Sequence, residues 1–233
     1  MRLRKKPWVS GALEEYNDIV LIKDLLCAKT LDAGANLGEE MQKARDRMKG
    51  HWHEIFDRTA PLHVELGTGK GKFISEMAQR HPEINFIGIE SQQDVLYYVA
   101  EKIREKELTN VRLLVFDVSH LLEIFAPGEI DRLYINFCDP WPKVRHGKRR
   151  LTHRTFLDKY SIVLADGGKI FFKTDNRALF DFSLEQFAEK GLVTDKVTFD
   201  LHKSDFADNV MTEYETKFSG MGTKLNRCEI RFP

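Results

Sequence analysis

The sequence has no excess of charge of either sign, few cysteines and no long apolar run. Lysine and arginine together number 36, and so do aspartate and glutamate. The chain as a whole therefore does not attract nucleic acid by net charge, and any such partner must be held by a local patch. The three cysteines, Cys27, Cys138 and Cys228, form no C-x-x-C pair, which argues against a disulfide framework and a structural zinc site. We expect a reducing compartment, the cytoplasm.

No stretch of the chain approaches the roughly 18 apolar residues that cross a membrane. The charged start, MRLRKKPWVSG, is not followed by the apolar region of a secretion signal. The two histidines of HWHEIF, His51 and His53, would lie on different sides of a helix, which does not favour shared metal binding. We therefore predict no membrane segment, no secretion and no metal site.

Short β-rich apolar runs alternate with helical patterns from about residue 62 onward. The expected strands cover residues 62–66, 84–90, 111–116, 131–137 and 168–174. Helical patterns over 72–80, 91–107 and 155–165 separate them. This alternation predicts an α/β fold with a doubly wound, mostly parallel sheet that is buried on both faces. Two later runs, 193–200 and 227–232, show no clear helix between them and predict an antiparallel C-terminal hairpin at one edge, which gives a seven-stranded sheet.

The first sixty residues lack this alternation and contain one helical pattern, near 38–50. Their basic start is formed by Arg2, Arg4, Lys5 and Lys6. A chain of 233 residues is long enough for one sizeable α/β domain and short for two. We interpret residues 1–60 as an extension that packs on the domain or is partly mobile, and residues 61–233 as the domain itself. The basic start is either an extra phosphate contact or a basic tail.

A glycine loop, ELGTGKGKF, ends the first expected strand and spaces Gly67, Gly69 and Gly71 as G-x-G-x-G. Glycine lets the backbone approach a ligand at the carboxyl end of a strand. The spacing is not that of a triphosphate P-loop, which needs Ser or Thr after Gly-Lys, and it misses the G-x-G-x-x-G of a dinucleotide fold by one residue. S-adenosylmethionine is the third ligand that such a loop can bind.

Acidic residues mark the ends of the first three expected strands. They are Glu65, Glu90 and Asp117. A carboxylate at Glu65 suits a ligand ammonium group, Glu90 lies where an acid meets a ribose diol in folds of this kind, and Asp117 can reach an adenine amino group. Acids are common where strands meet solvent. Three of them at one sheet edge beside a glycine loop nevertheless favour a nucleoside ligand.

The fourth expected strand runs into FCDPWPKVRHGKRR. Asp139 starts an Asp-Pro-Trp-Pro turn at the switch point of the sheet, where ligands bind, so we expect it at the reaction centre. The basic run after the turn is formed by Lys143, Arg145, His146, Lys148, Arg149 and Arg150. A charge run is often only solvated surface. Beside a ligand pocket in a neutral chain, it predicts a phosphate-contacting surface and a polyanionic substrate.

The segments ELGTGKGKF, FCDPWPKVRHGKRRL, FFKTDNRALF and SDFADNVMTEYETKF, spread over about residues 60 to 232, resemble the bacterial tRNA (guanine-N7)-methyltransferase family. The chain departs from the family pattern at Cys138, where Pro or Ser is usual, and at Val144, where a basic residue is usual. The resemblance implies a class I methyltransferase domain that takes S-adenosylmethionine and releases S-adenosylhomocysteine. It further implies methylation at N7 of a guanine in the tRNA variable loop, position 46.

The resemblance also implies roles for single residues. Methyl-donor contacts fall on Glu65, Glu90, Asp117 and Asp139, in agreement with the interpretation above. It adds tRNA contacts at Lys143, Asp175, Thr212, Glu213, Tyr214 and Glu215. Guanine N7 has a free lone pair, so no general base is needed, and Asp139 is expected to position the reactants and stabilise the charge that develops on guanine.

Several roles in the second half stay open at this point. Glu213 and Glu215 are both candidates to accept from N1–H and N2–H₂ of guanine. Tyr214 either stacks on a base or packs the structure, and Asp175 either caps a helix or contacts guanine and ribose.

Two other functions also stay open: a methyltransferase of the same fold that acts on an exocyclic amine of another RNA or a protein, and a tRNA-binding module without catalysis. The intact acids and glycines argue against the second. Members of the family occur as monomers and as homodimers, and the similarity in the second half of the chain favours a homodimer.

Overall fold

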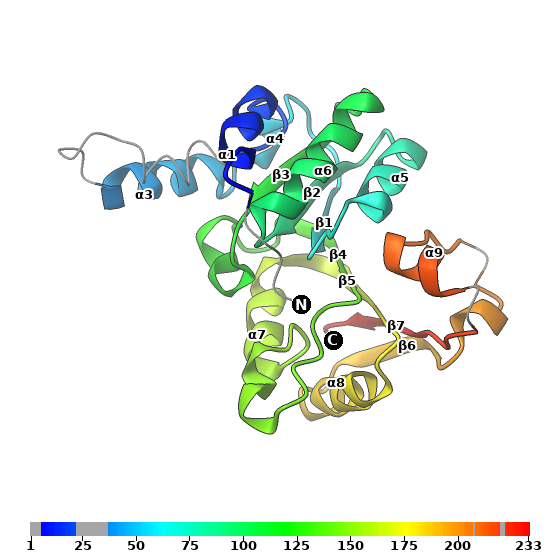
Figure 1. Cartoon of the computed structure of the whole chain (residues 1–233). Helices are drawn as coiled ribbons and strands as arrows, with labels where there is room; N and C mark the ends of the chain where they lie inside the picture. Colours follow the sequence, from blue (N-terminus) through cyan, green and yellow to red (C-terminus); the bar gives the residue numbers. More distant parts are fainter. Residues whose placement is uncertain (1–5, 22–36, 207, 220–221) are drawn as a thin grey trace.

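The computed structural model contains one seven-stranded sheet with the strand order β3-β2-β1-β4-β5-β7-β6 (Figure 1). It describes residues 6–21, 37–206, 208–219 and 222–233. The strands are β1 Leu62–Leu66, β2 Asn85–Glu90, β3 Val111–Val115, β4 Ile130–Asn136, β5 Leu164–Thr174, β6 Val193–Thr198 and β7 Asn226–Arg231. The α-helices are α1 Val9–Ala12, α3 Leu37–Met48, α4 Trp52–Ile55, α5 Lys72–Arg80, α6 Gln93–Glu105, α7 Arg154–Val163, α8 Arg177–Glu189 and α9 Glu213–Ser219. Short 3₁₀ turns are η1 Leu13–Tyr16, η3 Val118–Glu123, η4 Val144–Arg149 and η5 Leu201–Lys203.

The first five strands are parallel. β1 pairs with β2 and β4, β2 with β3, and β4 with β5, all in the parallel sense. Their runs are largely apolar because both faces of such a sheet are covered, and every residue of β1 is buried. The predicted doubly wound fold is confirmed, with β1 to β4 within one residue of their expected bounds. β5 is longer than expected and begins at Leu164.

The antiparallel pairing at the C-terminus is also confirmed, with a different arrangement in detail. β7 lies between β5 and β6 and is antiparallel to both, so β6 alone forms the edge. The expectation of no helix between the last two strands was wrong, because η5 and α9 lie there. α9 starts with a Ser/Thr-x-x-Glu capping sequence, in which the Thr212 hydroxyl accepts from the Glu215 N–H at 3.0 Å. Its seven residues are too few for a clear helical period.

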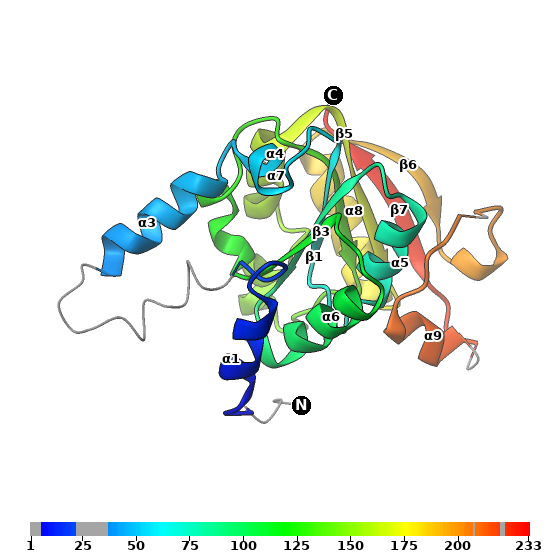
Figure 2. The same cartoon turned by 90° about the horizontal axis from the view of Figure 1, so that it is seen from above.

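Helices cover the two faces of the sheet to different extents (Figures 1 and 2). Neighbouring residues of β2 show the two layers: Ile87 packs with the core under η3, α7 and α8, whereas Phe86 packs with α5 and α6. The α5 and α6 layer covers β2 and β3. Over β4 and β5, the same face carries only a small cluster of Phe73, Tyr134 and Val210.

The first described segment packs on the edge beside β3. α1 and η1 lie against α6, and Val20 forms a parallel bridge with Leu113. The Leu113 N–H donates to the Ile19 carbonyl at 2.9 Å. This bridge covers part of an edge strand that would otherwise expose its hydrogen-bonding groups. Of the residues discussed from the sequence, Arg2, Arg4, Lys5 and Cys27 lie outside the described ranges.

The expected helix near residues 38–50 is α3. Arg45 at its end pairs with Glu123 at 2.6 Å. The adjacent Trp52 is buried and its Nε1–H donates to the Ile124 carbonyl at 3.0 Å, while His51 and His53 are exposed. Trp52 therefore anchors this part of the chain on the core. Within the described ranges, no helix combines the length and the apolarity needed to cross a membrane.

Gly88, at the centre of β2, lies where the sheet and α5 pack closely against each other. A Cβ on Gly88 would meet side-chain atoms of Thr68, Leu113 and Ile74 at 2.7, 2.8 and 2.9 Å. Because β2 is paired on both sides, we expect Gly88→Ala to lower the free energy of unfolding by about 2 kcal/mol, measured by urea denaturation. Gly11→Ala in α1, where a Cβ would meet no described atom within 4 Å, serves as the control and should not lower stability, because alanine favours a helix over glycine by up to about 1 kcal/mol. Equal midpoints for the two variants would contradict this packing.

Candidate active site

The carboxyl ends of four neighbouring parallel strands bring the predicted donor residues together. β3, β2, β1 and β4 lie side by side and run in the same direction. Glu65 is near the end of β1 and Glu90 ends β2, while Asp117 and Asp139 follow β3 and β4. The topology thus places all four carboxylates along one edge of the sheet, where ligands bind in folds of this type.

The glycine loop joins β1 to α5 at this edge. Gly67, Gly69 and Gly71 all have positive φ, at +83°, +52° and +78°. A Cβ on Gly71 would approach Val99 Cγ1 to 2.4 Å, so only glycine allows α5 to start this close to α6. On Gly67 and Gly69 a Cβ would meet nothing within 4 Å. The first part of the loop therefore has open space above it.

Glu65 is the most unusual carboxylate of the site. Its side chain is buried, and Oε1 accepts from Asn136 Nδ2 at 3.0 Å. Oε2 is also buried and has no hydrogen-bond partner among the residues that the structure describes. Burial raises the pKa of Glu65 to about 8, although Asn136 and Lys173 act in the opposite direction. A buried polar atom without a partner is costly and needs an explanation, and a ligand ammonium group at Oε2 would supply one.

The next two carboxylates are more open to solvent. Glu90 accepts from the Gly69 N–H at 3.2 Å and from the Gln92 N–H at 3.1 Å, which fixes it beside the glycine loop. Asp117 accepts from the Ser119 N–H at 2.8 Å and caps η3. Partial burial raises the pKa of Asp117, but the hydrogen bonds from Ser119 outweigh this effect and the net shift is downward. Asp117 is therefore an anion at neutral pH.

The Asp-Pro-Trp-Pro turn leaves β4 through an unusual backbone. Phe137 and Trp141 both have positive φ, at 52° and 40°, which is rare for residues of this size. Asp139 lies between them and is exposed. Arg150 holds the turn: its Nε donates to the Pro140 carbonyl at 3.0 Å and its terminal nitrogen to the Trp141 carbonyl at 3.1 Å. Strained backbone that is held in place in this way is typical of functional sites.

The basic run forms η4 directly after this turn. Lys143, Arg145, Lys148 and Arg149 are exposed, and the Arg149 guanidinium lies 4.9 Å from the centre of the Trp141 ring. Arg150 differs from them, because its guanidinium lies over Phe182 at 4.3 Å and bonds the turn. Four of the six residues of the predicted phosphate-contacting run thus present their charge to solvent. Of the other two, Arg150 is engaged in holding the turn that carries Asp139, and the half-buried His146 has its ring 5.7 Å from that of Trp141.

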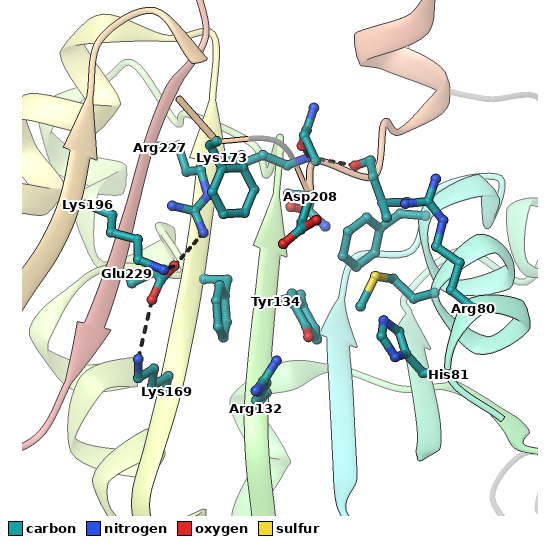
Figure 3. Close-up of a pocket in the computed structure, with 17 residues that line it drawn as sticks. Arg80, His81, Arg132, Tyr134, Lys169, Lys173, Lys196, Asp208, Arg227 and Glu229 are labelled. Carbon is teal, nitrogen blue, oxygen red and sulfur yellow. Dashed lines mark hydrogen bonds and ion pairs between the residues drawn. The ribbon is translucent and has the colours of Figure 1, made fainter. Parts of the chain in front are cut away.

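A cavity of about 530 Å³ opens on the face of β4, β5 and β7 (Figure 3). Asn136 and Lys173 are among the residues that line it. Asn136 is the residue that bonds Glu65, so the cavity adjoins the donor side of the site.

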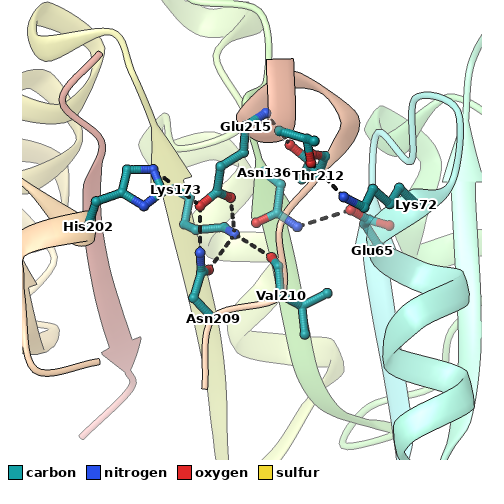
Figure 4. Close-up of polar contacts among 10 residues, drawn as sticks. Glu65, Lys72, Asn136, Lys173, His202, Asn209, Val210, Thr212 and Glu215 are labelled. Carbon is teal, nitrogen blue, oxygen red and sulfur yellow. Dashed lines mark hydrogen bonds and ion pairs between the residues drawn. The ribbon is translucent and has the colours of Figure 1, made fainter. Parts of the chain in front are cut away.

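A buried polar network stands beside Glu65 (Figure 4). Lys173 Nζ donates to Asn209 Oδ1 at 3.0 Å, to the Val210 carbonyl at 2.9 Å and to Glu215 Oε2 at 2.9 Å. Burial lowers the pKa of Lys173, against the attraction of Glu215. The other oxygen of Glu215 accepts from Asn209 Nδ2 at 2.5 Å. Glu215 is completely buried with both oxygens engaged, so it is not free to accept from a base as anticipated from the sequence.

The other predicted residues of this segment fasten α9 to its surroundings. Glu213 Oε1 accepts from the Lys72 N–H at 2.9 Å, at the start of α5, and from Lys102 Nζ at 2.6 Å. The Tyr214 hydroxyl donates to Asp175 Oδ2 at 2.6 Å. This hydrogen bond raises the pKa of Tyr214 to about 12.

The structure excludes one of the alternatives for Asp175 and supports packing for Tyr214. Asn176, and not Asp175, caps α8, because its side chain accepts from the Leu179 N–H at 2.8 Å. The Tyr214 ring lies 5.0 Å from Phe137 and 4.4 Å from Phe218, centre to centre, while 39% of the residue is exposed. Tyr214 therefore packs the structure and still offers part of its ring to solvent.

Sequence reasoning did not single out Asn136, Lys173 or Asn209. A signal was present for Lys173, because a lysine in the middle of the apolar run IFFKT is unusual and buried lysines need a partner. For Asn209 no local pattern existed. No group of three or more His, Cys, Asp or Glu side chains that could hold a metal ion occurs in the described part of the chain.

Comparison with known proteins identifies the family of the chain. A family model described as "Putative methyltransferase" matches residues 59–228. The tRNA (guanine-N(7)-)-methyltransferase of Halalkalibacterium halodurans is 49% identical over 232 residues, which cover 100% of this chain and 96% of the relative. The protein of the same name from Bacillus subtilis is 44% identical over 232 residues, 100% of this chain and 99% of the relative.

Solved structures share the fold at lower identity. An antibiotic-related methyltransferase has a TM-score of 0.59 at 19% identity and covers 78% of this chain and 92% of its own. Aeropyrum pernix fibrillarin with natively bound S-adenosyl-L-methionine has a TM-score of 0.50 at 15% identity, over 74% of this chain and 66% of its own. These structures show the fold alone, whereas the full-length relatives show that the chain belongs to the bacterial tRNA (guanine-N7)-methyltransferase family.

Proposed function

We propose that the protein transfers the methyl group of S-adenosylmethionine to N7 of a guanine in the variable loop of tRNA, position 46, and releases S-adenosylhomocysteine. The assignment of tRNA and guanine N7 is supported by relatives named tRNA (guanine-N(7)-)-methyltransferase, which match the chain along its whole length. The donor assignment is carried by one observation, the buried and unpartnered Oε2 of Glu65 beside the glycine loop. A cytoplasmic location follows from a tRNA substrate.

The donor is held, in this proposal, by three carboxylates and the glycine loop. Glu65 takes the ammonium group, Glu90 the ribose hydroxyls and Asp117 the adenine amino group. When bound, S-adenosylmethionine supplies a sulfonium-activated methyl group. The open space above Gly67 and Gly69 leaves room for the ligand backbone to approach the loop.

The residues at the reaction centre have an electrostatic task. Guanine N7 offers a lone pair without a proton, so the chain needs no general base there. Asp139 is exposed at the end of β4 on a turn that Arg150 holds rigid. A carboxylate fixed in advance can orient the reacting groups and stabilise the positive charge that arises on the purine.

The tRNA is held, in this proposal, by charge and by one acidic contact to the base. Lys143, Arg145, Lys148 and Arg149 contact phosphates, since they are exposed beside the turn. Of the two glutamates considered for the base, Glu213 is favoured over Glu215, because Glu213 is partly exposed and Glu215 is completely buried. Asp175 and Tyr214 lie at the same surface, joined by their hydrogen bond.

The reaction is tested with a tRNA transcript and its single-base variant. We expect methyl transfer from labelled S-adenosylmethionine to an unmodified transcript with guanine at position 46, and none when that base is adenosine. Borohydride and aniline treatment should then cleave the product at that base, as N7-methylguanine requires. Equal labelling of both transcripts would rule out the proposed position, and a labelled product that resists cleavage would favour an exocyclic amine as the acceptor.

Asp139→Asn is expected to lower kcat by about 100-fold or more, the usual effect of removing one preorganised electrostatic group. Because Asp139 is exposed and bonds no described core residue, the thermal unfolding midpoint should stay within about 2 °C of wild type. Asp166→Asn, at another exposed aspartate, is the control and should keep full activity. Wild-type turnover in Asp139→Asn would remove this residue from the mechanism.

The raised pKa of Glu65, to about 8, predicts a pH-dependent donor affinity. Below this value the free protein holds Glu65 largely protonated, whereas an ammonium group prefers the carboxylate, so binding must release a proton. The affinity for S-adenosylmethionine, measured by calorimetry, should therefore rise with pH between 6 and 7.5, by up to about tenfold per pH unit. Glu65→Gln should bind more weakly and lose this dependence. An unchanged pH profile in Glu65→Gln would exclude Glu65 as the source.

A further inference from the structure

The face of the sheet that lines the 530 Å³ cavity carries rows of cations on either side of a row of aromatic rings (Figure 3). In the register of β4 and β5, Arg132 is opposite Lys169, Tyr134 opposite Phe171, and Asn136 opposite Lys173. β7 extends the last two rows with Glu229 and Arg227. Alternate residues of a strand point to the same side, so these side chains share one surface.

This surface has more positive than negative charge. The cations that line the cavity are Arg80, Arg132, Lys169, Lys173, Lys196 and Arg227, and the acids among the described lining residues are Asp208 and Glu229. Glu229 alone contacts three of them, Arg227 at 2.7 Å, Lys196 at 3.1 Å and Lys169 at 3.4 Å. Glu76 and Glu215, outside the lining, pair with Arg80 and Lys173. Two more cations than carboxylates remain, and among the described residues no carboxylate forms an ion pair with Arg132.

The aromatic row provides flat apolar surface between the charges. The rings of Tyr134 and Phe171 are stacked with centres 5.1 Å apart, and Phe73 lies 5.1 Å from Tyr134. Arg132 lies over the Phe171 ring at 5.5 Å, and Phe171 is partly exposed. Aromatic rings flanked by cations are what proteins use to bind unpaired nucleotides, with the base on the ring and the phosphate on the charges.

A purely structural role does not account for this face. In a doubly wound sheet, helices normally cover both faces, and here the α5 and α6 layer ends at β4, where Phe73 of α5 packs on Tyr134, while α9 meets β5 at Lys173. Covering the face with apolar protein would strip water from several cations, which is unfavourable without paired carboxylates. The composition of the face therefore favours a polar, negatively charged occupant.

We propose that this cavity binds a nucleotide of the tRNA other than the target guanine, with its phosphate on Arg132 and Lys169 and its base against Phe171. The inference rests on the proposed function, because it takes tRNA as the source of the nucleotide. The cavity adjoins the reaction edge through Asn136, which bonds Glu65. Asp139 follows β4, the strand that also carries Arg132, so RNA that presents a base at Asp139 lies next to this face of the sheet.

The test is a charge reversal at Arg132, which is exposed and holds no described ion pair. Arg132→Glu should weaken the binding of an unmodified tRNA transcript, measured by fluorescence anisotropy, by about tenfold at low salt, and should reduce the slope of log affinity against log salt by about 1. The matched control is Lys106→Glu, since Lys106 is exposed just after α6 and does not line the cavity. The control should change affinity less than twofold. Affinity for S-adenosylmethionine should be unchanged in both variants.

Three results would overturn the proposal. One is equal tRNA affinity and salt slope for Arg132→Glu and Lys106→Glu. Another is conversion of a dimer to a monomer by Arg132→Glu in sedimentation, because the face would then be a contact between protein chains. The third is binding of guanosine monophosphate that depends on Arg132 and that tRNA does not displace, which would make the ligand a free nucleotide. A wild-type protein that binds tRNA as predicted but does not methylate it would refute the proposed function and leave this site in place.

Discussion

The arrangement of the site depends on one buried ion pair, between Lys173 of β5 and Glu215 of α9, whose charged atoms lie 2.9 Å apart. Taking two charges out of water is costly, and the pair is tolerable only because other hydrogen bonds complete it. Asn209 bonds both partners, and the Val210 carbonyl accepts from Lys173. Losing either charge would leave the other buried and unpaired. The pair therefore holds the short helix α9 against the sheet, which its seven residues could not do through helical propensity.

With α9 fixed, the two halves of the site are connected. Glu213 reaches from α9 to the Lys72 N–H at the start of α5, directly after the glycine loop. Tyr214, the next residue, bonds Asp175 after β5. The segment that is proposed to meet the tRNA thus contacts the segment that is proposed to meet the donor. Positioning reactants within a few tenths of an ångström is the main task of an enzyme that needs no proton transfer, and a rigid link of this kind serves it.

The sequence was sufficient for features that depend on local pattern. The period of apolar residues located β1 to β4 within one residue, and the strand ends correctly indicated that the acids beside the glycine loop gather at one edge, because parallel strands bring their carboxyl ends together. The same reasoning failed where partners are distant. Lys173 meets Glu215 across 42 residues, and Arg150 bonds backbone carbonyls, which no side-chain pattern encodes. Counted as one more cation in a basic run, Arg150 could not be told apart from its exposed neighbours.

The carboxylates of the site differ in environment more than in chemistry, and this difference supports the different tasks proposed for them. Glu65 is buried with one oxygen unpaired, so its negative charge is costly until a cationic group arrives. Such a residue recognises the charge of a ligand, because the ligand relieves the cost. Asp139 is exposed on a constrained turn, so its charge is available throughout the reaction and its position is fixed by Arg150. When two carboxylates of one site lie in such different environments, they commonly have different roles. Here one is suited to bind the donor and the other to steady the positive charge as it moves from sulfur to the base.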